Sequence, residues 1–149
     1  MNQDIVQGHQ GKLWRLNVRA YVWDQKSHLL LVRIPRHQGP DWELPGGGIQ
    51  VEESASEALR RELHEETGLT ELSKIKAIEA LKWEIFDPTI VTKLRLAFDG
   101  LLVQEFLVWT DTLKPTIDPI DGEVGESGWF TVDEARARLD YKSQGSSFE

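Results

Sequence analysis

The sequence contains no cysteine among its 149 residues, and this absence excludes disulfide bonds, thiol catalysis and cysteine-ligated zinc sites. Histidine is scarce, and the four histidines are scattered along the chain with no pair at metal-ligand spacing. No apolar run approaches the ~18 residues that a membrane-spanning helix requires. The first residues, MNQDIVQGHQ, lack the basic segment and following apolar stretch of a signal peptide. We therefore expect a cytoplasmic protein with no membrane partner.

Positive charge is also in deficit, since 17 basic residues face 25 acidic ones and the formal net charge is −8. An acidic surface repels a phosphate backbone, so the composition argues against bulk nucleic-acid binding. The content of 40% hydrophobic and 28% charged residues is typical of a soluble globular protein. The length suits one domain over residues 1–149 that buries its own core.

The acidic excess is concentrated in one part of the chain. Between Glu43 and Glu71 there are eight glutamates against two basic residues, Arg60 and Arg61, so this segment carries six of the eight surplus negative charges. The ordinary explanation of such a run is a solvated helix face.

The pattern of apolar residues predicts a mixed-sheet α/β domain. We expect strands over Arg15–Trp23, Leu29–Val32, Trp42–Leu44, Ile75–Glu84, Thr92–Phe98, Leu101–Thr110 and Trp129–Phe130. We expect loops at Gly46–Gly48 and over Asp111–Gly128, and a terminal helix over Glu134–Leu139 capped by Thr131 or Asp133. A central helix over Ala55–Glu66 is clearly bounded, because Ser54 and Glu57 form a capping-box pattern and Gly68 supplies a stop.

Three glutamates share one face of this central helix. At about 100° per residue, Glu62, Glu65 and Glu66 lie close together, while Leu59 and Leu63 border them and are better placed for the core. No lysine lies on the acidic face, so a metal ion is a plausible compensating cation. Carboxylates without histidine or cysteine favour magnesium or manganese over zinc. The glycines just upstream would let the backbone approach such an ion and a phosphate closely.

At this point the residues resemble a known family. Gly47, Glu53 and the run RELHEETGL over Arg61–Leu69 resemble the Nudix box at all nine of its specified positions. The resemblance implies a Nudix fold, in which a mixed β-sheet lies between helices (α/β/α). It also implies a Mg²⁺-dependent pyrophosphohydrolase, with Mn²⁺ as a substitute, in which water attacks phosphorus of a nucleoside diphosphate linked to another moiety.

The resemblance also assigns roles to individual residues. It implies metal ligation by Glu62, Glu65 and Glu66 and by the carbonyl of Gly46, and it makes Glu53 a structural acid paired with Arg61. The family often takes one further acid from a loop before a closing Trp-Phe strand, where Glu123 is the first candidate and Glu126 the second. The implied catalytic residues are Glu62, Glu65 and Glu123, and the implied structural residues of the box are Gly47, Glu53, Arg61 and Gly68.

Two residues depart from the usual pattern in the loop before the helix. Gln50 stands where glutamate is common, and Glu52 stands where glycine is common. Neither belongs to the specified positions, so we expect a local change of the loop and retained activity.

The substrate branch is indicated only by scattered features. Phe86 stands at a position where diadenosine polyphosphate and RNA 5′-pyrophosphate hydrolases tend to have an aromatic residue, usually tyrosine, and it has the ring without the hydroxyl group. The segment WELP at 42–45 also resembles that branch. The glutamine-rich strand motif of RNA-processing members is absent from Gly100–Phe106. Ile85 stands where ADP-ribose hydrolases tend to have proline. These features favour a dinucleoside polyphosphate or a nucleoside triphosphate as substrate.

The candidate substrate-binding residues are aromatic or basic: Arg33, Arg36, Trp42, Trp83 and Phe86. Two alternatives stay open: hydrolysis of ADP-ribose or a nucleotide sugar, and a non-catalytic Nudix sensor that binds a nucleotide without cleaving it. The expected partner is a small nucleotide, and the protein is either a monomer or a homodimer.

Overall fold

A computed structural model gives the structure of the chain over residues 5–33, 42–111 and 126–143. The strands are β1 (Ile5–Gln7), β2 (Leu13–Trp23), β3 (Leu29–Arg33), β4 (Trp42–Glu43), β5 (Gly46–Gly48), β6 (Lys74–Ala77), β7 (Lys82–Ile85), β8 (Gly100–Trp109) and β9 (Glu126–Phe130). The helices are the 3-10 turn η1 (His9–Gly11), α1 (Ala55–Thr67), α2 (Pro88–Leu94) and α3 (Val132–Ser143).

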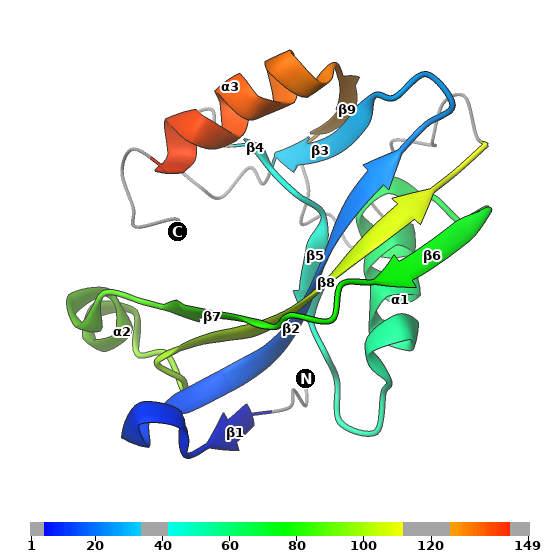
Figure 1. The fold of residues 1–149 in the computed structure, drawn as a ribbon. Helices are drawn as coiled ribbons and strands as arrows, with labels where there is room; N and C mark the ends of the chain where they lie inside the picture. Colours follow the sequence, from blue (N-terminus) through cyan, green and yellow to red (C-terminus); the bar gives the residue numbers. More distant parts are fainter. Residues whose placement is uncertain (1–4, 34–41, 112–125, 144–149) are drawn as a thin grey trace.

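Two long parallel strands form the centre of the sheet. β2 and β8 pair in register from Trp14↔Gly100 to Trp23↔Trp109, and all other pairings are antiparallel (Figure 1). The side of β2 that faces away from β8 pairs successively with β1, β5 and β3. The side of β8 that faces away from β2 pairs with β7 and then with β6. β3 also carries β4 and β9 on its two sides. The sheet is therefore mixed, as expected.

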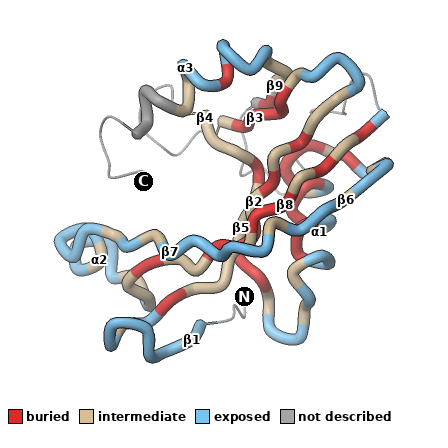
Figure 2. The backbone as a smooth tube through the Cα atoms, in the orientation of Figure 1, coloured by how far each residue is buried: buried red, intermediate tan, exposed pale blue. Residues whose placement is uncertain are grey.

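Helices cover both faces of this sheet. The even-numbered residues of β2, Val18 to Val22, are buried in one core with Leu59 and Leu63 of α1. The odd-numbered residues Tyr21 and Trp23 contact the second core, which contains Ala135 of α3. This alternation follows from the two-residue period of a strand and confirms the α/β/α arrangement. The buried residues follow the centre of the sheet and the inner side of α1 (Figure 2).

Helix α1 begins at the expected residue, Ala55, and ends at Thr67, one residue beyond the expected Glu66 and directly before the expected stop at Gly68. The Ser54 hydroxyl accepts from the Glu57 N–H at 3.0 Å, and the Glu57 carboxylate accepts from the Ser54 N–H at 2.8 Å, which completes the capping box. Gly68 ends the helix with φ 75°, a left-handed conformation that glycine adopts without strain. The sequence therefore fixed both boundaries of this helix through local hydrogen bonding.

Three expectations for secondary structure were wrong. Residues 46–48 form strand β5 on β2 rather than a loop. The segment expected as a strand over Thr92–Phe98 instead contributes to helix α2, because Asp87 caps the Thr89 N–H at 2.8 Å and Pro88 occupies the first turn. The expected strand Ile75–Glu84 is two strands, β6 and β7, separated at residues 78–81.

The last elements are longer than expected. β9 begins at Glu126, so the end of the expected loop Asp111–Gly128 is strand, and residues 112–125 lie outside the described part. Helix α3 spans Val132–Ser143 rather than Glu134–Leu139 alone, and Thr131 caps it by accepting from the Glu134 N–H at 3.2 Å. Within the described residues, no helix has the length and apolar character needed to cross a membrane.

Candidate functional site

The acidic face of α1 lies against β5. Glu62 and Glu66 are buried, and the Glu66 carboxylate accepts from the Gly46 N–H at 3.0 Å. Leu59 and Leu63 on the adjoining face are fully buried in the core, as expected, and His64 is exposed on the far side. Of the three glutamates on the predicted acidic face, the structure thus places Glu62 and Glu66 against the glycine segment.

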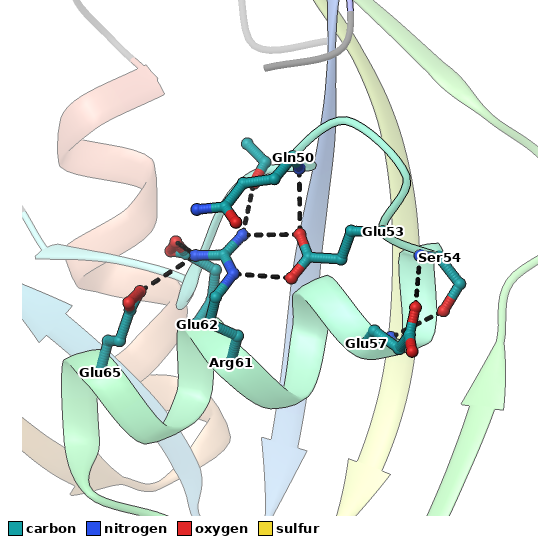
Figure 3. Close-up of polar contacts among 8 residues, drawn as sticks. Gln50, Glu53, Ser54, Glu57, Arg61, Glu62 and Glu65 are labelled. Atoms are coloured by element: carbon teal, nitrogen blue, oxygen red, sulfur yellow. Dashed lines mark hydrogen bonds and ion pairs between the residues drawn. The ribbon is translucent and has the colours of Figure 1, made fainter. Parts of the chain in front are cut away.

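Arg61 lies at the centre of this face and contacts three glutamates (Figure 3). Its guanidinium donates to both carboxylate oxygens of Glu53, at 2.7 and 2.9 Å. One nitrogen also donates to Glu62 at 2.9 Å and to Glu65 at 3.0 Å. A further bond at 2.8 Å reaches the carbonyl of Gly48 in β5. We call Glu53, Arg61, Glu62 and Glu65 the α1 cluster.

The pairing of Glu53 with Arg61 confirms the ion pair expected from the sequence. The hydrogen bond from Arg61 lowers the pKa of the Glu53 carboxyl below its ordinary value, despite the opposing effect of partial burial. The same contact raises the pKa of Arg61, so its charge is fixed. Glu53 also accepts from the Gln50 N–H at 3.0 Å, which ties the preceding loop to the helix. Gln50 therefore enters the network through its backbone, so its side-chain difference leaves this bond intact.

Glycine is required at Gly46 of β5, because an added Cβ would overlap the backbone carbonyl of Val18 in β2. At Gly47 and Gly48 an added Cβ would instead meet the ends of two charged side chains, which would have to move. A Cβ on Gly47 would lie 2.3 Å from a carboxylate oxygen of Glu62. A Cβ on Gly48 would lie 2.1 Å from the guanidinium of Arg15. The glycines thus allow a carboxylate from α1 to lie directly on the backbone of β5.

The α1 cluster matches the donor chemistry of a hard divalent cation. The carboxylates of Glu62 and Glu66 are buried beside backbone groups of β5, and buried carboxylates require a cationic or hydrogen-bonding partner. Among the described residues, no three acidic or histidine side chains form a group that could hold a metal ion, and Arg61 bridges Glu62 and Glu65. A divalent cation would therefore compete with Arg61 for the same carboxylate oxygens.

The expected substrate-binding residues fall into separate groups. Arg33 and Trp42 are cross-strand partners on β3 and β4, and the Arg33 guanidinium lies 5.5 Å from the Trp42 ring centroid. Trp83 on β7 stacks on His9 at 3.8 Å and contacts Trp14 edge-on. Phe86 packs against Phe98 with ring centroids 5.9 Å apart. The structure brings Arg33 and Trp42 together, and it gives Trp83 and Phe86 aromatic neighbours of their own.

Two expected site residues lie outside the described part of the chain. These are Arg36, expected to bind substrate, and Glu123, expected as the additional acid. Glu126, the second candidate for that acid, occupies β9 opposite Arg33, and only its backbone is described.

Sequence reasoning missed a second charged cluster on the opposite face of the sheet. Arg19 donates to Glu84 at 2.7 Å and lies 3.5 Å from Glu105, which also accepts from the Tyr21 hydroxyl at 3.2 Å. Lys82 lies 3.4 Å from the other oxygen of Glu105. We call Arg19, Tyr21, Lys82, Glu84 and Glu105 the Arg19 cluster. The sequence gives no signal for it beyond charged residues at alternate strand positions, because its members come from three strands.

The Arg19 cluster adjoins the α1 cluster through the backbone, since Arg19 pairs with Gly46 across β2 and β5. Burial lowers the pKa of Arg19, but the contacts with Glu84 and Glu105 outweigh this effect and raise it overall. Burial and the Glu105 carboxylate both raise the pKa of Tyr21. Glu105 itself is almost fully buried.

Comparison with protein families identifies the family of this chain. The model of the NUDIX domain matches residues 13–148, which is nearly the whole chain. The chain belongs to the Nudix family. The glycine strand and the acidic face of α1 described above both lie within the matched residues.

The chain is also similar, in sequence or in fold, to individual proteins. The chain is 36% identical over 86 residues to the RNA pyrophosphohydrolase of Bartonella tribocorum, a match that covers 56% of this chain and 42% of that protein. The chain thus spans less than half the length of this curated relative. The fold is similar to that of the E. coli dihydroneopterin triphosphate pyrophosphohydrolase, with a TM-score of 0.68, 12% identity and coverage of 88% and 95%. A C. elegans Ap4A hydrolase gives a TM-score of 0.60, 16% identity and coverage of 89% and 91%.

Proposed function

We propose that the protein is a Mg²⁺-dependent Nudix pyrophosphohydrolase, with Mn²⁺ as a possible substitute, that hydrolyses a phosphoanhydride bond of a nucleotide. The observation that carries the proposal is the α1 cluster: Glu62 and the neighbouring Glu66 contact the glycine strand, Glu65 joins Glu62 through Arg61, and no carboxylate of the Nudix box is replaced. A non-catalytic sensor would not need this complete set. Magnesium, when bound, neutralises the diphosphate and lowers the pKa of an attacking water.

The chain's own residues have distinct tasks in this proposal. Glu62, Glu65 and Glu66 would hold the cation together with the carbonyl of Gly46, and Arg61, which donates to Glu62 and Glu65, would orient both carboxylates before the cation binds. The water oxygen forms a bond to phosphorus as the bridging P–O bond breaks, and the nucleotide fragment leaves on that bridging oxygen. A carboxylate, either of Glu65 or of Glu123, takes the proton from the water.

For the substrate we propose a dinucleoside polyphosphate or a nucleoside triphosphate. Arg33 and Trp42 support this proposal, because a guanidinium beside an indole offers a phosphate contact and a stacking surface for a base. A second candidate, a triphosphate at an RNA 5′ end, is favoured by the similarity to the RNA pyrophosphohydrolase of B. tribocorum. ADP-ribose and nucleotide sugars are the alternative with the least support, because Ile85 replaces the proline common in those hydrolases.

The test is a panel of substrates with magnesium, with products separated by chromatography. It contains nucleoside triphosphates, diadenosine polyphosphates, a 5′-triphosphorylated RNA, ADP-ribose and NADH. We expect the first two classes to be cleaved fastest. Preferential cleavage of the RNA would select the second candidate, and tight binding without cleavage of any compound would support the sensor instead.

The variant Glu65→Gln tests the role of the α1 cluster. The substitution removes a negatively charged oxygen ligand for the metal ion and keeps the size of the side chain. We therefore expect kcat to fall at least about a hundredfold and the melting temperature to stay unchanged. Glu57→Gln is a matched control on the same helix, because glutamine preserves the capping box and the position is remote from the acidic face. A Glu65→Gln protein with a normal rate would remove this residue from the proposed site.

A further inference from the structure

Exposed apolar side chains are concentrated at one end of the molecule. Eight of the ten large exposed apolar residues in the described part belong to β1, the start of β2, or the stretch from residue 81 to residue 94. They are Ile5, Val6, Leu13, Leu81, Trp83, Ile85, Ile90 and Leu94. Figure 2 shows this exposed surface over β1, β7 and α2. Such a concentration on a soluble protein indicates an interaction surface.

Strand β7 lies at the edge of the sheet within this surface. One side of β7 pairs with β8, and no other strand of the described residues pairs with its outer side. The Phe86 N–H donates to the Asp99 carbonyl next to β8, and hydrogen bonding alternates along a strand. The backbone groups of Trp83 and Ile85 are therefore directed outward. An open edge of this kind can accept another strand.

The side chains of β7 are complementary to themselves when two copies run antiparallel. Around a twofold axis at Trp83, Lys82 lies opposite Glu84 of the other copy, and Leu81 lies opposite Ile85. The charged pairs then occupy one face of the joined sheet, and the apolar residues with Trp83 occupy the other face. A strand that matches itself in both charge and apolar character fits a second copy of this chain better than an unrelated peptide.

The positions of the charged side chains agree with this pairing. The Lys82 side chain is 49% exposed although it contacts Glu105, so its ammonium group can reach an additional partner. The Glu84 carboxylate is held by Arg19 on the same face of the sheet, which limits its rotamers. Opposite charges directly across a strand pair stabilise it, and like charges destabilise it.

We propose that β7 pairs with β7 of a second copy around a twofold axis at Trp83, which joins the two sheets into one across a homodimer. The exposed residues of α2, Ile90 and Leu94, extend the contact, since a strand of four residues alone is smaller than an ordinary dimer interface. This inference involves no residue of the α1 cluster, and it places Trp83, which the sequence suggested as a substrate-binding residue, at the dimer axis instead.

Sedimentation velocity over a dilution series tests the proposal directly. The natural protein should sediment as a dimer that dissociates on dilution. Ile85→Pro removes the outward-directed N–H of residue 85 and removes no N–H that is directed toward β8, so this variant should be a monomer. The matched control Ile85→Thr keeps the N–H and should remain dimeric. A natural protein that is monomeric throughout, or an Ile85→Pro protein that stays dimeric, would overturn the proposal.

A charge exchange tests the register of the pairing. Lys82→Glu places two glutamates opposite each other and should weaken dimerisation about tenfold or more, while Lys76→Glu on β6 is the control for net charge. Glu84→Lys should weaken its own dimer in the same way. A mixture of the two variants should restore a dimer, because each glutamate then faces a lysine. If the mixture stays monomeric while both proteins melt as folded domains, this register is wrong.

Discussion

The two arginine–glutamate clusters lie on opposite sides of β5 and are assembled in different ways. All members of the α1 cluster come from one loop and helix, residues 53–65, so local geometry brings them together. The members of the Arg19 cluster are separated by up to 86 residues and meet only because β2, β7 and β8 are neighbours. The first cluster therefore depends on helix formation and the second on the complete sheet.

The two clusters also differ in their balance of acidic and basic residues. The α1 cluster holds several acidic groups around one arginine, an arrangement that favours an added cation. The Arg19 cluster has two basic and two acidic residues, so its formal charges already balance. We infer that the α1 cluster is organised for binding and that the Arg19 cluster is organised for stability. Each of the following substitutions tests this contrast.

Glu105→Gln should have the largest effect on stability. Glu105 is buried and accepts from Tyr21 beside two basic side chains, so loss of its charge leaves Arg19 and Lys82 incompletely balanced. We expect the free energy of unfolding to fall by about 2 kcal/mol. The midpoint of urea unfolding measures this change, with Glu79→Gln in the exposed segment between β6 and β7 as the control. An unchanged midpoint would mean that the Arg19 cluster does not stabilise the fold.

The two clusters should lose stability at opposite ends of the pH scale. Because Arg61 lowers the pKa of Glu53 below 4.5, their pairing contributes fully above that pH and is lost as the pH falls through the folded-state value. Because the pKa of Tyr21 is raised above 10.0, its contribution is present below that pH and is lost as the pH rises through the folded-state value. Melting temperatures across pH should therefore fall at both extremes.

Substitutions assign these two losses to their sources. Arg61→Gln should lower stability at neutral pH by about 1 kcal/mol and flatten the acid side of the curve. Tyr21→Phe should flatten only the alkaline side. If the melting temperature of Arg61→Gln falls as steeply at acid pH as that of the natural protein, other carboxylates account for the loss. Asp24, whose pKa is also lowered, is one such group.

Glu52→Gly should have the smallest effect and the opposite sign. Glu52 has φ 69°, the left-handed conformation that glycine adopts easily and that costs other residues about 1–2 kcal/mol. Glycine loses more chain entropy on folding, so we expect a net gain of about 0.5 kcal/mol. Thermal unfolding measures the gain, and Glu52→Ala is the control because it keeps the strain. Equal melting temperatures for the glycine and alanine variants would contradict a strained backbone.

A residue other than glycine at Glu52 predicts a local change of the loop relative to the usual pattern, and this stays a prediction. In this chain the backbone adopts a left-handed conformation at Glu52, and the Glu53 N–H donates to the Gln50 carbonyl in a turn. The loop is held by its connection to the α1 cluster strongly enough to tolerate a strained residue.

Short-range patterns predicted the features that depend on neighbouring residues. The capping box at Ser54, the stop at Gly68 and the acidic face of α1 follow from hydrogen bonds and spacing within one or two helical turns. The contact of Arg61 with Glu65 was missed although its four-residue spacing is a standard ion-pair signal. Helix α2 was missed because its β-branched residues suggested a strand. The helix forms because an aspartate caps its first turn and a proline occupies that turn, and both are local signals.

The acidic face of α1 could be predicted from the order of the residues, because helix periodicity places Glu62, Glu65 and Glu66 on one face. Tertiary pairing, in contrast, makes residues 46–48 a strand, since glycine carries no strand propensity and the pairing with β2 supplies the hydrogen bonds. It also decided the Arg19 cluster and the exposed edge at β7. Both depend on which strands become neighbours, and this is a long-range property set by the packing of the whole sheet.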